Sequence, residues 1–453
     1  MLASSDVIFE QFVDADLGCA SYLVGCGAAR ETVVVDPSYR IEPYLTAAER
    51  HGVRVVRVLE THTHADHVSG HGRFALEHGV PVSIHGAADA EYPHDALADG
   101  DEIDVGNVRL RVLHTPGHRP EHCAFAVADR TRADEPWLVL TGDSLFVGDA
   151  ARPDLAVEAR EGAEGLYASL AKLAALGDGV EVFPGHVAGS LCGAAMSSKA
   201  SSTIGFERRF NRALAAGSLP AFLEFSLEQP TRPPNMERIV EVNRGPFVPG
   251  PAPLARLTAV PADACVLDVR SPDAFAEAHV RGALNVPLDG SGFGTKAGFV
   301  LPPNRAIALH AASDTDTERA ADQLRAVGFL ELAGVLEAPV ATVSFEPVAI
   351  AELDAFLAAN GHVLIDVREK DEHDAGFIPG STNIPYRIVR QAVDAGLIGN
   401  APVVTICETG ARAAVAASVL AAAGIDARPV LHGGVGDWRA HGGKTCSFRR
   451  CGG

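Results

Sequence analysis

Short apolar runs separated by polar loops fill residues 1 to about 245. Such runs predict β-strands, here at Ser21–Val24, Thr32–Val35, Val53–Leu59, Val80–Ile84, Val108–Leu113, Trp137–Thr141 and Val180–Phe183. Helical patterns lie between some of them, for example over Ser69–His78. The mixture of strands and helices predicts an α/β domain in this part of the chain.

The second half of the chain contains an internal repeat. One stretch begins at Val266–Arg270 and ends at Gly282–Pro287, and another begins at Leu364–Arg368 and ends at Gly380–Pro385. The two match in length and in the positions of their Asp, Arg, Gly, Asn and Pro residues, which predicts two copies of one α/β unit. Residues 243–253, rich in Pro and Gly, predict an irregular linker before the repeat. We therefore expect domains over 1–245, 255–345 and 346–453.

The composition fits a globular protein. The chain has 453 residues, of which 47% are hydrophobic, and it contains no apolar run long enough to span a membrane. A formal net charge of −20 argues against nucleic acid or an anionic membrane as partner. Eight cysteines without framework spacing, and an N-terminus without a secretory pattern, predict a cytoplasmic location.

The run Thr61–His67 carries the strongest chemical signal. It holds three imidazoles and one carboxylate directly after a predicted strand. Side chains two apart on extended backbone share a face, so His62 and His64 point the same way. The turn that follows brings Asp66 and His67 toward the same place. Imidazole and carboxylate ligands suit zinc, iron or manganese, so this run predicts a metal site.

Three further strand ends each supply one residue of ligand type, namely His118, Asp143 and His186. A single His or Asp in such a loop usually has a capping or turn role. Three together with the first motif instead favour a metal centre built from several strand-end loops.

These motifs resemble those of the metallo-β-lactamase superfamily, which has an αβ/βα sandwich fold. Over residues 1 to about 245 the chain is most similar to persulfide dioxygenases and next to glyoxalase II thioesterases. The dioxygenase resemblance implies one Fe(II) held by His62, His118 and Asp143. The same resemblance implies that these ligands are oriented by an outer group of four residues, His64, Asp66, His67 and His186. The hydrolase resemblance implies instead two Zn²⁺ ions bound directly by these same four residues, with Asp143 bridging.

Two other features of this region belong to the same resemblance. Arg152, in an Arg-Pro-Asp-Leu segment, resembles the residue that binds the carboxylate of the thiol substrate, and the alternative is a solvated surface arginine. Residues 189–205 resemble fusions of the dioxygenase with a sulfurtransferase. There Cys192 would line the substrate pocket or pack as a small buried hydrophobe.

The second repeat contains a candidate nucleophile. An apolar strand, Val403–Ile406, leads into Cys407, and a helix starts at Ala413. A thiolate at this place is stabilised by the helix N-terminus and by converging backbone N–H groups. Gly410 permits the tight loop and Arg412 adds positive charge, whereas a glutamate at position 408 could raise the pKa of the thiol or disfavour thiosulfate.

Together with the repeat, this loop resembles the active-site loop of rhodaneses, α/β sulfurtransferases with parallel sheets. The first repeat lacks the machinery, because alignment puts Ala311 at the nucleophile position and Asp316 where the loop arginine should be. Cys265 precedes a different strand, and His310 is expected to be structural. We expect an inactive spacer or docking domain there. The tail carries two cysteines, Cys446 and Cys451. We expect this tail to be a frayed end, and we do not expect the two cysteines to act as a redox pair.

The domain order resembles bacterial persulfide dioxygenase–sulfurtransferase fusions used in sulfide detoxification. The resemblance implies oxidation of a low-molecular-weight thiol persulfide by O₂ to sulfite, and sulfur transfer through a Cys407 persulfide to form thiosulfate. It also implies an enzyme that acts as a homo-oligomer. The alternatives are a dinuclear zinc thioester hydrolase of the glyoxalase II type and a non-enzymatic sulfur relay.

Overall fold

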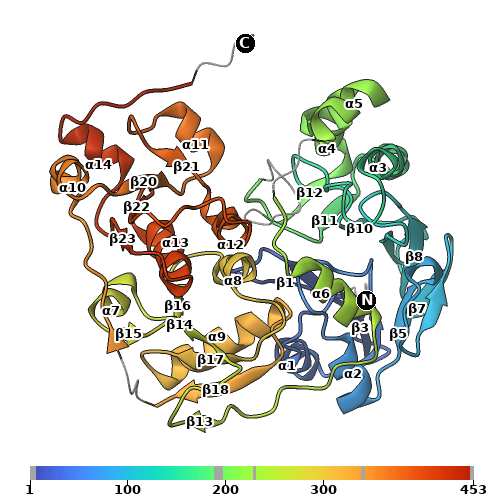
Figure 1. The fold of residues 1–453 in the computed structure, drawn as a ribbon. Helices are drawn as coiled ribbons and strands as arrows, with labels where there is room; N and C mark the ends of the chain where they lie inside the picture. The colour runs from blue at the N-terminus through green and yellow to red at the C-terminus, as the bar shows by residue number, and fades with distance from the viewer. Residues whose placement is uncertain (1–6, 188–196, 228–230, 338–341, 449–453) are drawn as a thin grey trace. The chain divides into compact units, whose positions relative to one another are not determined.

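The computed structural model describes residues 7–187, 197–227, 231–337 and 342–448. The chain forms two compact units, one of Met1–Pro251 with Arg325–Gly328 and the other of Ala252–Leu324 with Phe329–Gly453 (Figure 1). Among the described residues, no helix is both long enough and apolar enough to cross a membrane.

The first unit is built on two six-stranded sheets, with orders β1-β2-β3-β4-β5-β6 and β12-β11-β10-β9-β8-β7. The strands of the first sheet are β1 Val7–Val13, β2 Ala20–Cys26, β3 Glu31–Val35, β4 Arg54–Leu59, β5 Val82–His85 and β6 Asp95–Leu97. Those of the second are β7 Glu102–Val105, β8 Val108–His114, β9 Cys123–Asp129, β10 Leu138–Gly142, β11 Glu181–Pro184 and β12 Ser202–Thr203. The helices are α1 Glu42–His51, α2 His71–His78, α3 Ala159–Ala174, α4 Ile204–Phe210, α5 Leu219–Ser226 and α6 Met236–Arg244, with short 3₁₀ turns at Gly86–Ala88 and Leu214–Ala216.

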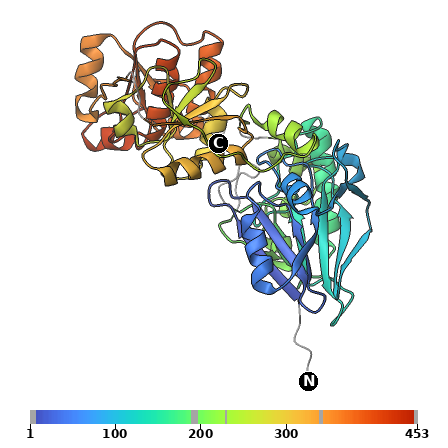
Figure 2. The same ribbon diagram turned by 90° about the horizontal axis from the view of Figure 1, so that it is seen from below.

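Three apolar layers hold this unit together. Residues of both sheets, such as Val24 and Phe125, share one core cluster, so the sheets face each other. The outer face of the first sheet packs on α1 and α2, through Tyr44 and Phe74. The outer face of the second packs on α3 and α5. The layers are therefore αβ/βα, and Figure 2 shows the helices outside the strands.

The described part of the second unit contains two larger sheets that correspond to the two repeats and one antiparallel pair of short strands, β15 and β19. The first has the order β13-β18-β17-β14-β16 and the second β21-β20-β22-β23, and their neighbouring strands pair in parallel. The first repeat comprises β13 Arg256–Leu257, β14 Cys265–Asp268, α7 Pro272–Glu277, β15 His279–Val280, β16 Leu284–Asn285, α8 Phe293–Val300, β17 Ile307–His310, α9 Asp314–Ala326, β18 Leu332–Leu336 and β19 Thr342–Val343. The second comprises a 3₁₀ turn Ile350–Glu352, α10 Leu353–Asn360, β20 Val363–Asp366, α11 Lys370–Ala375, β21 Thr382–Asn383, α12 Tyr386–Asp394, β22 Val403–Ile406, α13 Ala411–Ala422, β23 Ala427–Pro429 and α14 Val435–Ala440.

The repeat recognised in the sequence has a hydrogen-bonding basis. In the first repeat the carboxylate of Asp268 accepts from Arg270 at 2.6 Å. The side chain of Asn285 donates to the backbone carbonyls of both residues at 3.0 and 3.1 Å. The same bonds recur in the second repeat, formed by Asp366, Arg368 and Asn383. These matching residues hold the turn after β14 in the first repeat and the turn after β20 in the second.

The predicted linker is partly ordered on the first unit. Its first residues, Asn243 and Arg244, are the end of α6, so the prediction of an irregular segment was wrong there. The Asn243 side chain is buried, accepts from Ser69 N–H and donates to the carbonyls of His64 and His67. These three bonds join the end of α6 to the segment His64–Ser69. They explain why the helix extends into residues for which the Pro and Gly composition predicted an irregular segment.

Candidate metal centre and sulfur-transfer loop

Three predicted ligands meet at the ends of different strands. His62 follows β4, His118 follows β8 and Asp143 follows β10. Their ligand atoms all lie within 4.8 Å of one another, and each side chain is buried. The residues are far apart in sequence, so only the meeting of the two sheet edges brings them together.

This group has the chemistry of a divalent metal site. His62 Nε2 and Asp143 Oδ2 are buried and have no hydrogen-bond partner within the described part of the chain. His118 Nε2 lies 3.6 Å from that same carboxylate oxygen. Unpartnered buried polar atoms are costly, and a metal ion would satisfy both. Two imidazoles and one carboxylate suit iron(II) or zinc.

Neighbouring groups orient both imidazoles toward the centre. His62 Nδ1 lies 2.9 Å from the Thr61 hydroxyl, and His118 Nδ1 donates to the Arg152 carbonyl at 2.9 Å. Each contact leaves Nε2 to face the centre. Gly117, before His118, has φ +145°, and a Cβ there would lie 2.4 Å from the Leu166 backbone. Glycine is therefore required in this turn.

Burial and neighbouring charge set the protonation of the group. Burial lowers the pKa of His62, and the nearby His64 and His118 lower it further. Burial also lowers the pKa of His118. Both rings are therefore neutral, as ligands must be. Burial opposes ionisation of Asp143, but His186 outweighs it and lowers the carboxyl pKa to about 2.

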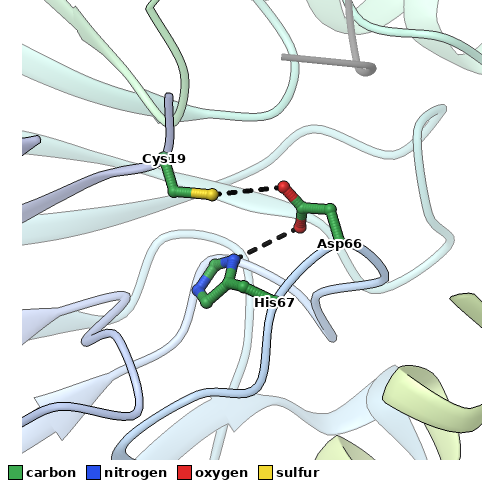
Figure 3. A group of neighbouring side chains, drawn as sticks. All are labelled: Cys19, Asp66 and His67. Atoms are coloured by element: carbon green, nitrogen blue, oxygen red, sulfur yellow. Dashed lines mark hydrogen bonds and ion pairs between the residues drawn. The ribbon is translucent and has the colours of Figure 1, made fainter. Parts of the chain in front are cut away.

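A chain of polar contacts extends from Asp143 away from the centre. His186 lies 2.7 Å from Asp143 Oδ1 through Nδ1 and 2.6 Å from Asp66 Oδ2 through Nε2. The other partners of Asp66 are the Cys19 thiol at 3.3 Å and His67 Nδ1 at 3.2 Å (Figure 3). Figure 3 shows Cys19 and His67 contacting different oxygens of the Asp66 carboxylate.

Cys19, Asp66 and His67 form a second group with ligand atoms within 4.8 Å. The sequence reasoning missed Cys19, because it lies far from the motif along the chain and has no local signal. A cavity of about 330 Å³ reaches this group, with Cys19 and His67 in its lining. Burial raises the pKa of the Cys19 thiol well above its ordinary value, and the Asp66 charge adds to this.

His64 is oriented by two carboxylates that the sequence analysis also missed. Its Nε2 lies 3.1 Å from Glu60 and 3.3 Å from Asp36, and all three side chains are buried. Glu60 in addition accepts from the Ser69 hydroxyl and lies 3.1 Å from His71 Nδ1. Burial opposes ionisation of Glu60, but the bond with His64 helps to lower its pKa to about 2. His64 Nδ1 is buried without a partner among the described residues.

Arg152 is not the solvated surface residue considered as an alternative. Its side chain is only 1% exposed, and its guanidinium donates to both carboxylate oxygens of Asp154 at 2.7 and 2.9 Å. Its carbonyl accepts from His118. Binding of a substrate carboxylate by Arg152 stays a prediction. Cys192 lies outside the described residues.

The candidate nucleophile Cys407 follows β22 and is fully buried. The Gly410 N–H donates to its sulfur at 3.1 Å. Gly410 has φ +90°, a conformation that favours glycine. The loop is closed behind the cysteine by Gly434, where a Cβ would lie 2.3 Å from the Cys407 carbonyl oxygen.

Arg412 is the second residue of α13, which begins at Ala411, two residues before the predicted start. Its guanidinium donates to both carboxylate oxygens of Glu372, at 2.6 and 2.8 Å. The positive charge expected of it is therefore already paired. Glu408 is also held in place, accepting from Gly436 N–H at 3.1 Å and pairing with Arg368 at 3.3 Å.

The first repeat places a different residue at the nucleophile position. Asp268 pairs with His310 in the sheet register as Asp366 pairs with Ile406, so Ala311 stands where Cys407 stands. His310 Nδ1 contacts the Asp268 carboxylate at 3.0 Å. Asp316 lies in the first turn of α9, where its carboxylate accepts from the Ser313 hydroxyl.

The chain end is ordered further than expected. Cys446 is exposed and pairs through two backbone hydrogen bonds of 2.8 Å with Phe377. Phe448 N–H donates to the Asp374 carbonyl at 2.9 Å. The expectation of a frayed end was therefore wrong as far as Phe448. Cys451 lies outside the described residues.

Comparison with known proteins agrees with this architecture. The family model described as the metallo-beta-lactamase superfamily matches residues 14–186, and the rhodanese-like domain model matches 253–338 and 349–441. A crystal structure titled metallo-beta-lactamase, from Staphylococcus aureus subsp. aureus COL, is 30% identical with a TM-score of 0.68 and covers 74% of this chain and 99% of that one. A crystal structure titled ETHE1, from Myxococcus xanthus, is 28% identical with a TM-score of 0.46 and covers 52% of this chain and 98% of that one.

Hydroxyacylglutathione hydrolase of Rhodospirillum rubrum is 34% identical over 169 residues, which are 36% of this chain and 60% of the hydrolase. The chain thus spans somewhat less than two thirds of the length of that relative. The S. aureus structure, in contrast, is covered almost completely. The chain therefore belongs to the metallo-beta-lactamase superfamily and carries two rhodanese-like domains after the metallo-beta-lactamase domain.

Proposed function

We propose that the protein is a persulfide dioxygenase fused to a sulfurtransferase. The observation that carries the proposal is the presence, in one chain, of the His62–His118–Asp143 group and of a Cys407 loop with rhodanese form. In the net oxidation a thiol persulfide, O₂ and water give the thiol and sulfurous acid, so the outer sulfur alone is oxidised. A thioester hydrolase would have no use for a sulfur-carrying cysteine.

The first unit supplies a preorganised ligand set. Iron(II) bound there would offer open positions for the persulfide sulfur and O₂. His62 and His118 present neutral Nε2 atoms, and Asp143 supplies the negative charge. His186 holds the second oxygen of Asp143, so the carboxylate orientation is set before metal or substrate binds.

Cys407 performs the sulfur transfer in the second unit. Its thiolate attacks the outer sulfur of a second persulfide, an S–S bond forms, and the thiol leaves as thiolate after the old S–S bond breaks. Sulfite then attacks that sulfur, releasing thiosulfate and restoring the Cys407 thiolate. The Gly410 N–H lies where it stabilises negative charge on the cysteine sulfur.

A dinuclear zinc hydrolase of the glyoxalase II type is the second candidate. It is favoured by the similarity to hydroxyacylglutathione hydrolase and by the second ligand-type group beside the first. Two zinc ions would use His64, Asp66, His67 and His186 in addition to the first three residues, and a metal-bound hydroxide would serve as nucleophile.

The deciding experiment is O₂ uptake by anaerobically purified protein given glutathione persulfide, with iron and zinc measured on the same sample. The proposal expects O₂ uptake, sulfite formation and about one iron per chain. No uptake with two zincs per chain would overturn it in favour of the hydrolase.

Two variants separate the activities. His62→Ala should abolish O₂ uptake and leave sulfur transfer through Cys407 intact, whereas Cys407→Ser should do the reverse. Cys265→Ser, which removes another buried thiol of the second unit, is the matched control. Loss of both activities in one folded variant would contradict the assignment of separate sites.

A further inference from the structure

Two arginines beside the Cys407 loop, Arg412 and Arg368, are both paired with carboxylates. Arg412 makes two bonds to Glu372, and its side chain is 23% exposed. Arg368 is bonded to the Asp366 carboxylate at 2.7 Å, and its remaining nitrogen lies 3.3 Å from Glu408. No cation among these residues is left without an acidic partner.

The acidic residues are held in place at the loop. Glu408 directly follows the nucleophile in the chain, and its carboxylate is fixed by the Gly436 N–H and by Arg368. Glu372 also accepts from the Glu369 N–H at 3.1 Å, as part of the cap of α11. The hydrogen bond from Arg412 lowers the pKa of Glu372, which keeps this carboxylate charged.

These charges act differently on the two chemical classes of sulfur donor. In thiosulfate the transferred sulfur is attached to a sulfonate-type group, and sulfite leaves when Cys407 attacks. Thiosulfate, a dianion, would have to displace Glu372 from Arg412 in order to bind. The sulfite released from it would then have to leave near the negative charge of Glu408. In a thiol persulfide the leaving group is a thiolate with no oxoanion beside the reacting sulfur. The electrostatic cost therefore falls mainly on the oxoanion.

We infer that Glu372 and Glu408 are specificity-determining residues that make Cys407 accept sulfur from thiol persulfides in preference to thiosulfate. The inference rests on the proposed sulfur-transfer function of Cys407. Glu372 acts by competing for Arg412, and Glu408 acts by repulsion. Sulfite must meet the same competition when it accepts sulfur from the Cys407 persulfide. Removal of Glu372 therefore lowers the KM for both oxoanions.

The test compares two donors with one acceptor, cyanide, in the full-length protein. Rates of thiocyanate formation are measured with thiosulfate and with glutathione persulfide for the wild type, Glu372→Gln and Glu408→Gln. Each substitution keeps the shape and removes one charge. We expect the ratio of kcat/KM for thiosulfate to kcat/KM for the persulfide to rise up to about 5-fold in each variant, the size of one exposed charge interaction.

Glu346→Gln is the matched control, because Glu346 also pairs with an arginine of the same repeat, Arg428 on β23. Its donor ratio should equal that of the wild type. An unchanged ratio in both Glu372→Gln and Glu408→Gln, with normal circular dichroism, would overturn the inference.

A second measurement separates this result from failure of the proposed function. If Cys407→Ser formed thiocyanate as fast as the wild type from both donors, the sulfur-transfer function itself would be wrong. If Cys407 is required and the KM for sulfite as acceptor is the same in Glu372→Gln as in the wild type, only the competition of Glu372 for Arg412 is refuted.

Discussion

Gly410 lies so close to Leu431 that a Cβ on Gly410 would come within 1.8 Å of the Leu431 carbonyl oxygen. The contact joins the loop that bears the nucleophile to the segment after β23. Because the clash would be with backbone, no side-chain rotation can relieve it.

Gly410→Ala should therefore displace the loop and lower sulfur transfer by at least about tenfold, with a loss of stability of about 1–3 kcal/mol. The measurement is thiocyanate formation from glutathione persulfide, together with urea unfolding. Gly424→Ala is the control, because Gly424 has φ +85° but has nothing within 4 Å of its Cβ position. Equal losses of sulfur transfer in the two variants would show that backbone strain, and not the Leu431 contact, decides.

His118→Ala should remove iron binding. The side chain is buried within the ligand group, and its loss leaves one imidazole and one carboxylate. We expect at least about a tenfold fall in bound iron after anaerobic reconstitution, measured by mass spectrometry of the metal. His94→Ala, at a residue outside the group, should retain iron. A His118→Ala protein with full iron content would exclude this ligand set.

His186→Ala should weaken metal binding by about 10- to 100-fold while leaving the stoichiometry at one iron per chain, as expected for a residue that orients Asp143. The measurement is a titration of the apoprotein with iron(II) under anaerobic conditions. In a dinuclear site the same substitution would lower the stoichiometry from two metals to one. The titration thus distinguishes the two candidate functions.

Ser418→Ala should destabilise the second unit. The hydroxyl of Ser418 on α13 accepts from the N–H of Asn285 in the first repeat at 3.0 Å, and both residues are buried. Leaving that N–H without a partner costs about 1–3 kcal/mol. Unfolding can be followed through Trp438 in a Trp137→Phe background, because the chain has two tryptophans. Ser291→Ala, at an exposed residue, should change stability by less than about 0.5 kcal/mol.

Asp268 should make the second unit sensitive to acid. Burial opposes its ionisation, but bonds with His310 and Arg270 outweigh this and lower its pKa. Its stabilisation is therefore fully present above the unfolded-state pKa of about 3.9 and is lost as the pH falls through the lower folded-state value. Asp268→Asn should flatten the acid limb of the unfolding free energy against pH. Asp263→Asn, at an exposed residue, should leave that limb unchanged.

Local patterns in the sequence were sufficient to place the main candidate ligands and the candidate nucleophile in strand-end loops. The structure places all four just after strand ends: Asp143 and Cys407 come directly after a strand, and His62 and His118 follow within the next four residues. The internal repeat was visible because the residues that hold its turns, such as Asp268 and Asn285, hydrogen-bond within a short segment. Interactions of this kind leave a signal in sequence spacing.

Interactions between distant segments left no such signal. Cys19 reaches Asp66 from the residue before β2, Glu372 reaches Arg412 from another helix, and Arg152 is buried rather than solvated. Each depends on which loops meet after the sheets have packed. The sequence by itself determined the domain order, the types of the candidate ligands and the candidate nucleophile, because these follow from local pattern. Only the tertiary structure decided which charges are paired and which atoms remain open to a metal or a sulfur donor, because burial and proximity arise when segments remote along the chain come together.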